Sequence, residues 1–218
     1  RIGLGLVFHI TPSNVPTNFA YSLIFGLITG NSNIIKVPTQ KFEQVKIICK
    51  SINKLLKKKH KSISKMVSIV RYSDNDNYTK KISSICNARI IWGGDNSIKN
   101  IRSFPLSQRA LDIAFADRYS FCVINTSEVI KLGKKEIGRL AERFYNDTYV
   151  VDQNACSSPH LIVWLGKKID KARNKFWRQL QNHVNKKYIL TETASVEKYT
   201  QLCGHILSLS NIKKYELY

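Results

Sequence analysis

The chain has 218 residues, of which 43% are hydrophobic, and this is enough for one large domain or two modest ones with buried cores. It carries 35 lysines and arginines against 15 acidic residues, a net charge of +20, which favours anionic partners such as nucleic acid, a membrane surface or phosphorylated small molecules. The longest apolar stretch, 19–28, is too short to span a bilayer, and no segment has the pattern of a signal peptide.

Strands and helices alternate along the first half of the chain. Short apolar runs predict the strands, and apolar residues at the helical period predict the helices. In chain order we expect a strand over 3–10, a helix over 15–29, a strand over 33–37, a helix over 42–59, a strand over 66–70, a helix over 74–84, a strand over 88–92, a helix over 97–102 and a strand over 111–116. Continuous apolar strands that alternate with helices predict an α/β fold, a Rossmann-like parallel sheet with helices on both faces.

A polar break and a mild shift in composition after Asp117 mark the expected boundary between two domains, 1–117 and 118–218. The second is predicted to be the start of another α/β domain, whose tail from Ile189 gives no firm assignment. Its expected elements are a strand over 121–124, a helix over 134–146, a strand over 161–164 and a helix over 169–184.

The five cysteines are widely spaced and odd in number, which argues against a disulfide framework and against a structural zinc site. Free thiols indicate a reducing compartment, so we expect the protein in the cytoplasm. Cys49, Cys86 and Cys122 lie among apolar residues and are predicted to be in the core. The chain starts inside a glycine-rich strand without an initiator methionine, and we therefore expect it to be a piece of a longer protein.

Cys156 lies in the turn 152–160, which is polar and rich in small residues and stands between a helical pattern and an apolar strand. A thiolate needs an exposed, polar setting in which to form and to attack, so this cysteine is a candidate nucleophile. The alternative is a small buried cysteine in an ordinary loop.

Two strand-to-helix turns in the first half are candidate ligand sites, because ligands of open α/β sheets lie beyond the carboxyl ends of the strands. They are Thr11-Pro12-Ser13-Asn14 and Gly93-Gly94-Asp95. Neither matches the GxGxxG fingerprint or the P-loop. A tight turn without a ligand explains the glycine pair equally well.

Three ordered motifs carry a family resemblance that covers nearly the whole chain. The stretches 5–16 and 30–38 resemble the I-x-P-W-N-x-P turn and the G-N-x-x-x-x-K strand of the aldehyde dehydrogenase superfamily, with Ser13 in place of tryptophan. His9 and Val15, the WGG sequence at 92–94 and the NACSSP sequence at 154–159 resemble one branch of it, the LuxC-like long-chain acyl-CoA reductases.

The resemblance implies a role for each matching residue. Cys156 matches the catalytic nucleophile, Asn14 the asparagine that stabilises the oxyanion, and Lys36 the lysine that holds the adenosine ribose. The implied cofactor site also includes Thr11, Pro12, Ser13, Thr39, Gly93, Gly94 and Asp95, with the pyrophosphate at the turn of Gly94 and Asp95. Without a ligand, Asn14 would be a helix N-cap and Lys36 a surface lysine.

Two departures from the superfamily pattern narrow the implied chemistry. Thr39 stands where NAD-using members carry a glutamate that would repel a 2′-phosphate, so NADPH is the expected cofactor. The general-base glutamate of oxidising members is missing from 114–118, where Asp117 is no motif match, and a reductase that releases an aldehyde needs no activated water. His9 and His160 are further acid/base candidates, although a structural role is favoured for both.

The implied activity is NADPH-dependent reduction of a long-chain fatty acyl thioester, an acyl-CoA or an acyl-protein, to the fatty aldehyde through an acyl-cysteine. An acyl-protein synthetase is an implied partner, and a homo-oligomer stays open. The alternatives are an aldehyde dehydrogenase that forms the acid, a catalytically dead homologue and a basic nucleic-acid-binding protein. The last is disfavoured because the aromatic residues lie in apolar runs, so we expect no nucleic-acid partner. The short apolar stretch and the cysteine spacing likewise lead us to expect no transmembrane segment and no metal.

Overall fold

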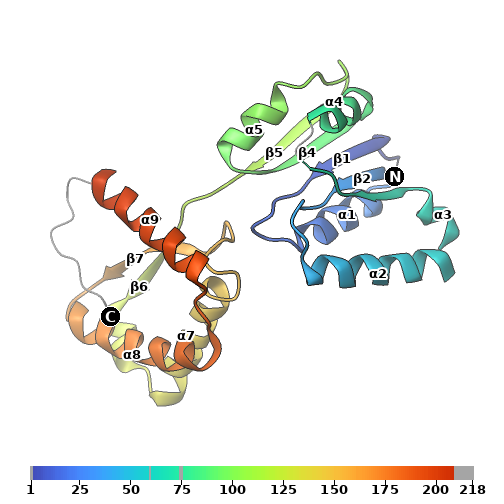
Figure 1. Cartoon of the computed structure of the whole chain (residues 1–218). Coiled ribbons are helices and arrows are strands. Elements are labelled where there is room, and N and C mark those ends of the chain that lie inside the picture. Colours follow the sequence, from blue (N-terminus) through green and yellow to red (C-terminus); the bar gives the residue numbers. More distant parts are fainter. Residues whose placement is uncertain (1, 59, 74–75, 209–218) are drawn as a thin grey trace. The chain divides into compact units, whose positions relative to one another are not determined.

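The computed structural model describes residues 2–58, 60–73 and 76–208 of the chain. The chain divides into two compact units, Arg1–Arg118 and Tyr119–Tyr218 (Figure 1). The composition of the chain predicts a boundary after Asp117, and the functions expected of the two parts stay predictions. Among the described helices, none is long and apolar enough to cross a membrane.

The first unit contains a five-stranded sheet with the strand order β3-β2-β1-β4-β5, and every neighbouring pair is parallel. This confirms the predicted Rossmann-like parallel sheet. The strands are β1 (Leu6–Ile10), β2 (Ser32–Lys36), β3 (Val67–Val70), β4 (Ala88–Gly93) and β5 (Leu111–Ala116). The helices are α1 (Asn18–Ile28), α2 (Glu43–Lys58), α3 (Lys61–Ser64), α4 (Asp76–Ile85) and α5 (Asp95–Arg102).

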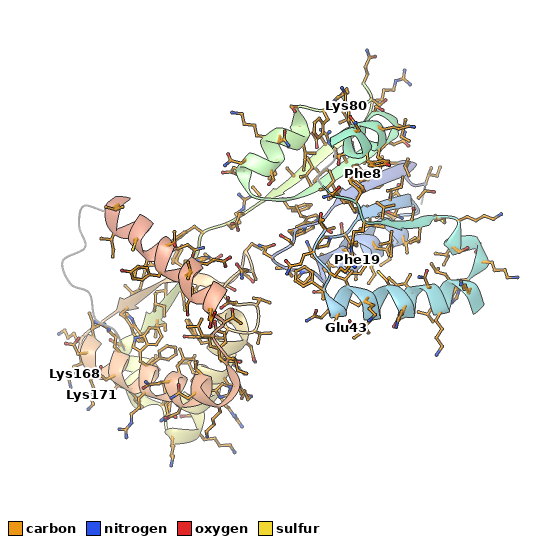
Figure 2. All side chains as sticks on the ribbon, viewed as in Figure 1. Phe8, Phe19, Glu43, Lys80, Lys168 and Lys171 are labelled. Atoms are coloured by element: carbon orange, nitrogen blue, oxygen red, sulfur yellow. The ribbon has the colours of Figure 1, made fainter. Side chains whose placement is uncertain are left out.

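Helices cover both faces of this sheet, with α1 and α2 on one side and α4 and α5 on the other (Figure 1). Because side chains alternate along a strand, each face has its own apolar cluster. Phe8 of β1 packs with residues of α4 and α5, whereas Phe19 of α1 packs with β2 and α2. Both phenylalanines are fully buried, while the labelled charged side chains such as Lys80 reach outward (Figure 2).

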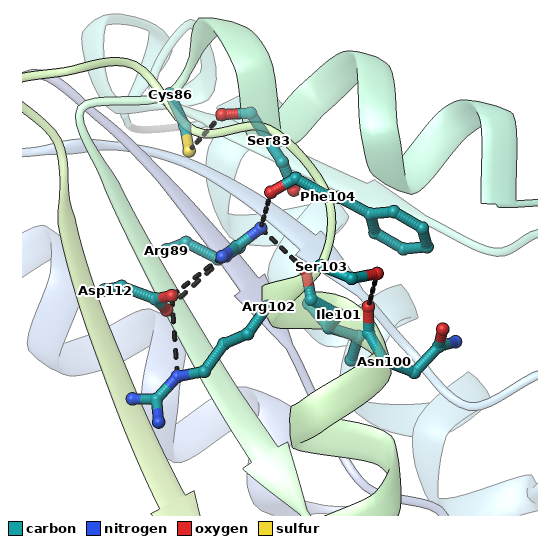
Figure 3. A network of polar contacts seen from close by, with 9 residues as sticks. All are labelled: Ser83, Cys86, Arg89, Asn100, Ile101, Arg102, Ser103, Phe104 and Asp112. Atoms are coloured by element: carbon teal, nitrogen blue, oxygen red, sulfur yellow. Dashed lines mark hydrogen bonds and ion pairs between the residues drawn. The ribbon is translucent and has the colours of Figure 1, made fainter.

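A buried arginine fastens the edge strand β5 to the sheet (Figure 3). The Arg89 side chain of β4 is only 1% exposed, and its Nη2 lies 2.7 Å from Oδ2 of Asp112 on β5. Its Nη1 donates to the carbonyl oxygens of Ile101 at 2.9 Å and Phe104 at 3.4 Å, at the end of α5. Arg102 reaches the same carboxylate at 3.6 Å. One guanidinium therefore links β4, β5 and the segment that joins α5 to β5.

The second unit contains two parallel strands, β6 (Ser120–Asn125) and β7 (Pro159–Leu165). Its helices are α6 (Thr126–Lys131), α7 (Lys134–Thr148), α8 (Ile169–Lys187) and α9 (Glu192–Ser208). Its core is centred on four residues, in which β6, α7 and α8 meet: Ile124, Ile137, Phe176 and Leu180.

Three cysteines of the two units were predicted to lie in the core. The thiols of Cys49 and Cys122 are partly buried, whereas that of Cys86 is fully buried. Burial raises the pKa of all three thiols.

Several element boundaries differ from those predicted. Helix α1 begins at Asn18 rather than 15, because Pro16 disfavours helical backbone at the residue before it and 13–17 form turns. Helix α5 begins two residues earlier than predicted, directly after Gly94. Part of the helix predicted over 74–84, at 74–75, and residue 59 of the helix predicted over 42–59 lie outside the described residues. The helices α3, α6 and α9 were not predicted.

Candidate active site

The candidate nucleophile, Cys156, lies on a hydrogen-bonded turn at the amino ends of β6 and β7. Cys156 is exposed and is a free thiol. Its carbonyl oxygen accepts a hydrogen bond of 2.6 Å from Oγ of Ser120, the first residue of β6. The buried Ser158 donates its amide to Ala155 O at 2.9 Å and its hydroxyl to Asp147 O at 2.6 Å. The backbone on either side of the thiol is therefore fixed while the sulfur stays accessible.

The turn that follows β1 carries the predicted oxyanion residue. Thr11 is buried and donates both its hydroxyl, at 2.8 Å, and its amide, at 3.2 Å, to the carbonyl of Lys36. Beyond it Asn14 is exposed, and its Oδ1 accepts a 3.0 Å hydrogen bond from the amide of Val15. Helix α1 has Thr17 as its N-cap, so the alternative reading of Asn14 as a helix N-cap was wrong. The bond to Val15 uses the oxygen of the Asn14 side-chain amide, whereas stabilisation of an oxyanion requires the hydrogens on its nitrogen, Nδ2.

The residues predicted to hold the adenosine ribose meet at the carboxyl ends of β2 and β3. The ammonium group of Lys36 lies 5.2 Å from the centre of the Tyr72 ring. Thr39 is exposed and donates its hydroxyl to Tyr72 O at 3.2 Å. Arg71, which follows β3, donates Nε to Pro38 O at 3.0 Å. Two cations and a hydroxyl are thus gathered around 38–39.

Sequence reasoning missed Arg71 and Tyr72. The signal was available, because both residues directly follow an apolar strand, and the carboxyl ends of neighbouring parallel strands lie at one edge of a sheet. Arg71 was inconspicuous among 35 basic residues. Its place beside Thr39 depends on β3 pairing with β2, which the local sequence does not reveal.

The second predicted turn leaves β4 next to β1. Gly93 ends the strand, Gly94 is the N-cap of α5, and Asp95 is in the first helical turn. The backbone of Gly94 has φ −72°, which any residue can adopt, and a Cβ placed there would meet no protein atom within 4 Å. Neither backbone strain nor packing within the protein therefore demands glycine at 94. Pro12 and Ser13 lie at the same edge of the sheet, because β1 and β4 are neighbours.

His9 is not available as an acid or base, because it is fully buried in a polar chain between β1, β2 and α1. Its Nε2 lies 2.9 Å from Oδ1 of Asn33, and its Nδ1 lies 2.7 Å from the hydroxyl of Ser22. Burial lowers the pKa of His9, against a smaller opposing effect of the Asn33 hydrogen bond. The other histidine candidate, His160, is exposed and stacks on Tyr119, with ring centres 5.4 Å apart.

Hydrogen-bond partners fix the proton positions in this buried chain. Asn33 donates Nδ2 to Asn31 O at 2.7 Å, so its Oδ1 must accept from Nε2 of His9. Nδ1 of His9 is then the acceptor for the Ser22 hydroxyl. Ser22 in turn accepts from Nε1 of Trp92 at 3.3 Å. Gly26 of α1 makes this approach feasible, since a Cβ there would lie 1.9 Å from Oδ1 of Asn33.

The structure therefore brings one group of the predicted residues together at the carboxyl edge of the first sheet. This group comprises Thr11, Pro12, Ser13, Lys36, Thr39, Gly93, Gly94 and Asp95. Cys156 belongs to the second unit, where its turn has its own supports. In the segment 114–118, Asp117 accepts from the amide of Arg118 at 2.9 Å, and Phe115 stacks on Trp92 with ring centres 4.1 Å apart.

Solved aldehyde dehydrogenases share the fold of this chain. Lactaldehyde dehydrogenase superposes with a TM-score of 0.63 at 12% identity, over 82% of this chain and 35% of that one. Glyceraldehyde-3-phosphate dehydrogenase from Methanocaldococcus jannaschii, solved with NADP, superposes with a TM-score of 0.59 at 15% identity, over 81% of this chain and 37% of that one.

Within that fold the chain belongs to the acyl-CoA reductase (LuxC) family, whose model matches residues 1–197. Long-chain acyl-protein thioester reductase 2 from Photobacterium leiognathi is 25% identical over 185 residues, or 84% of this chain. The long-chain acyl-protein thioester reductase of Aliivibrio fischeri is 25% identical over 82% of this chain. The chain spans 36% of the length of each of these two relatives. The predicted family is thereby confirmed.

Proposed function

We propose that the protein reduces a long-chain fatty acyl thioester to the fatty aldehyde through an acyl group carried on Cys156. The observation that carries this proposal is the exposed thiol on a turn whose backbone is anchored by Ser120 and Ser158. A nucleophile needs both properties, because the sulfur must reach the substrate while the peptide around it stays in place. Family membership and the names of the relatives support the substrate class.

The chemistry of the first step follows from the groups on the chain. The Cys156 thiolate attacks the carbonyl carbon of the thioester, and the carbonyl oxygen becomes an oxyanion. Nδ2 of Asn14 and the backbone amide of Cys156 are the proposed donors to that oxyanion, and removal of one such donor typically costs about 100- to 1,000-fold in rate. The carbon–sulfur bond of the substrate then breaks, the donor leaves as a thiol, and the acyl group remains on Cys156.

The residues at the carboxyl edge of the first sheet fit NADPH. Lys36, Thr39 and Arg71 offer two cations and a hydroxyl and no carboxylate, as a ribose with a 2′-phosphate requires. Gly94 leaves the N-terminus of α5 open to a pyrophosphate. When bound, NADPH supplies the hydride that brings the acyl group to the oxidation level of the aldehyde.

Reduction is favoured over oxidation to the acid by the segment 114–118, which contains no glutamate to activate water. Its one carboxylate, on Asp117, is engaged by the backbone of the next residue. The names of the relatives favour an acyl-protein as the donor, with acyl-CoA as the alternative. An acyl-protein synthetase and further copies of the chain are the proposed protein partners, in the cytoplasm.

The test is covalent labelling of the full-length protein with radiolabelled tetradecanoyl-CoA. We expect label on the peptide that contains Cys156, no label in Cys156→Ala, and normal labelling in the control Cys203→Ala. Addition of NADPH should then release labelled tetradecanal. Label that persists in Cys156→Ala would refute the assignment of the nucleophile, and release of tetradecanoic acid in place of the aldehyde would refute the direction.

A further inference from the structure

The backbone that leads into the Cys156 turn has an unusual conformation. Asp152 and Gln153 follow α7 and both have positive φ, 52° and 60°. Two consecutive residues with a Cβ rarely occupy this left-handed region, because the side chain then crowds the following carbonyl. The conformation persists only where surrounding contacts hold it in place. Within the chain, the amide of Asp152 donates to Tyr149 O at 3.1 Å and that of Gln153 to Thr148 O at 2.7 Å.

Two residues from later helices hold this segment from outside, and we call Asp152, Tyr188 and Lys198 the Asp152 clamp. The hydroxyl of Tyr188, the C-cap of α8, donates to Oδ1 of Asp152. The ammonium group of Lys198, on α9, lies 3.0 Å from the same oxygen. It also donates to the carbonyl of Asp152 at 3.4 Å and to Oε1 of Gln153 at 3.1 Å. The side chain and carbonyl of Asp152 and the side chain of Gln153 are thus tied to Tyr188 at the end of α8 and to Lys198 on α9.

The protonation of Tyr188 matches its role as a hydrogen-bond donor in the clamp. Burial, together with the hydrogen bond and the negative charge of Asp152, raises the pKa of Tyr188. The phenol therefore stays protonated and remains a donor to the carboxylate. Tyr149, which packs edge-on against Tyr188 with ring centres 5.1 Å apart, and Tyr145 also face this phenol. Tyr188 is thereby held by ring packing as well as by its hydroxyl.

We propose that the Asp152 clamp positions the peptide of Cys156 for attack, so that Tyr188 and Lys198 are positioning residues for the nucleophile. The inference rests on the proposed function. On the far side of the thiol, Ser120 and Ser158 anchor the turn to β6 and α7. On the near side only three residues separate Asp152 from Cys156, and the amide of Asn154 donates to Val151 O at 2.9 Å. With both flanks fixed, the sulfur and the backbone amide of Cys156 keep one orientation.

The test compares Tyr188→Phe, Lys198→Met and Lys198→Arg with two controls, Tyr199→Phe and Lys187→Met. Tyr199 is 67% exposed, and Lys187 pairs only loosely with Glu142, at 3.9 Å. In each protein we measure single-turnover acylation by tetradecanoyl-CoA over a range of concentrations, which separates the rate constant of acylation from the dissociation constant of the donor. Hydrogen exchange of peptides from 150–160 and from α8 is followed in parallel.

We expect Tyr188→Phe and Lys198→Met to acylate about 10- to 100-fold more slowly, because misplacement by about 1 Å costs on that order. The dissociation constant of the donor should change less than about twofold, since no residue of the clamp is proposed to contact the acyl chain. Exchange should rise in 150–160 and stay unchanged in α8. Lys198→Arg should recover most of the rate, because its guanidinium can still reach the carboxylate.

The possible outcomes distinguish failure of the positioning role from failure of the proposed function. If Tyr188→Phe and Lys198→Met are acylated as fast as wild type, the positioning role is overturned and the proposed function stays intact. A rise in exchange without a change in acylation would have the same meaning, namely that the clamp only packs the turn. No acylation of wild type itself would overturn the proposed function, and with it the positioning role. A slow Lys198→Met rescued by Lys198→Arg supports the clamp.

Discussion

Nε of Arg71 donates to the backbone carbonyl of Pro38 at 3.0 Å, and this contact brings a guanidinium from the end of β3 to the residue next to Thr39. Because β3 and β2 are parallel neighbours, the contact joins two segments 33 positions apart in sequence. The proposed 2′-phosphate contact thus gains a second cation besides Lys36.

Replacement of Arg71 by glutamine should weaken NADPH selectively. The loss of a charge beside a partly solvated phosphate is expected to raise the dissociation constant of NADPH by about 5- to 20-fold and to leave that of NADH within about twofold. Fluorescence titration with both cofactors measures the ratio. The control is Lys80→Gln, which removes an exposed charge from the same unit. Equal weakening of NADPH and NADH would mean that Arg71 does not face the 2′-position.

Thr39→Glu introduces a carboxylate at the position where a 2′-phosphate is expected. Since Thr39 is exposed, the repulsion is partly screened, and we expect the NADPH to NADH ratio of dissociation constants to rise by about 5- to 50-fold. NADH binding should hold or improve through bonds to the free ribose hydroxyls. The same titration tests the change, and a constant ratio would place the adenosine ribose elsewhere.

Gly94→Ala adds one methyl group at the turn between β4 and α5, where no protein atom lies within 4 Å. The stability of the unit should fall by no more than about 0.5 kcal/mol, because alanine is a poorer N-cap than glycine. NADPH should bind about tenfold more weakly, since the methyl group keeps the pyrophosphate from the backbone. The control is Gly138→Ala in α7, where a Cβ also meets no atom, and where alanine should stabilise the helix by about 0.5–1 kcal/mol without affecting cofactor binding.

Asp112→Asn removes the carboxylate that neutralises a guanidinium buried to 1% exposure. Breaking a buried pair typically costs about 3–5 kcal/mol, and the 23% exposure of Asp112 reduces our expectation to about 2–3 kcal/mol. Urea unfolding measures the loss. Glu43→Gln, which breaks the exposed pair with Lys46, should cost less than about 1 kcal/mol. A loss of similar size in both variants would mean that Arg89 finds another partner.

The buried His9 should make stability depend on pH. Its pKa in the folded protein is lowered from 6.5, so below about pH 6.5 the unfolded chain binds a proton that the folded chain does not. The contribution of His9 is therefore complete above pH 6.5 and is lost as the pH falls further. The free energy of unfolding measured from pH 7.5 to 5 should decline less steeply in His9→Gln than in wild type.

The sequence was sufficient for the strands of the first unit, because each is an apolar run between turn residues and all five alternate with helices. It was also sufficient to place Cys156 in a turn before a strand. It failed for α9, whose polar and apolar residues follow the helical period only weakly. The Asp152 clamp was out of reach for a different reason: Lys198 contacts a backbone 46 positions away, and no local pattern marks either partner. The N-cap of α1 was misjudged because Pro16 delays the helix.

The hydrogen-bonded chain from the partly buried Trp92 to the buried Asn31 places a particular demand on Ser22. It is the one link in this described chain that must donate a hydrogen bond and accept another through a single atom. Alanine at position 22 would leave the indole N–H of Trp92 and Nδ1 of His9 without their hydrogen-bond partner. Threonine would keep both hydrogen bonds but would add one methyl group to the packed interior. Homologues that keep His9 and Trp92 should therefore carry a hydroxyl at this helix position. Homologues that lack a hydroxyl at position 22 should also differ at positions 9 and 92. The residue at position 22 therefore indicates whether a homologue keeps this polar chain or has apolar side chains in its place.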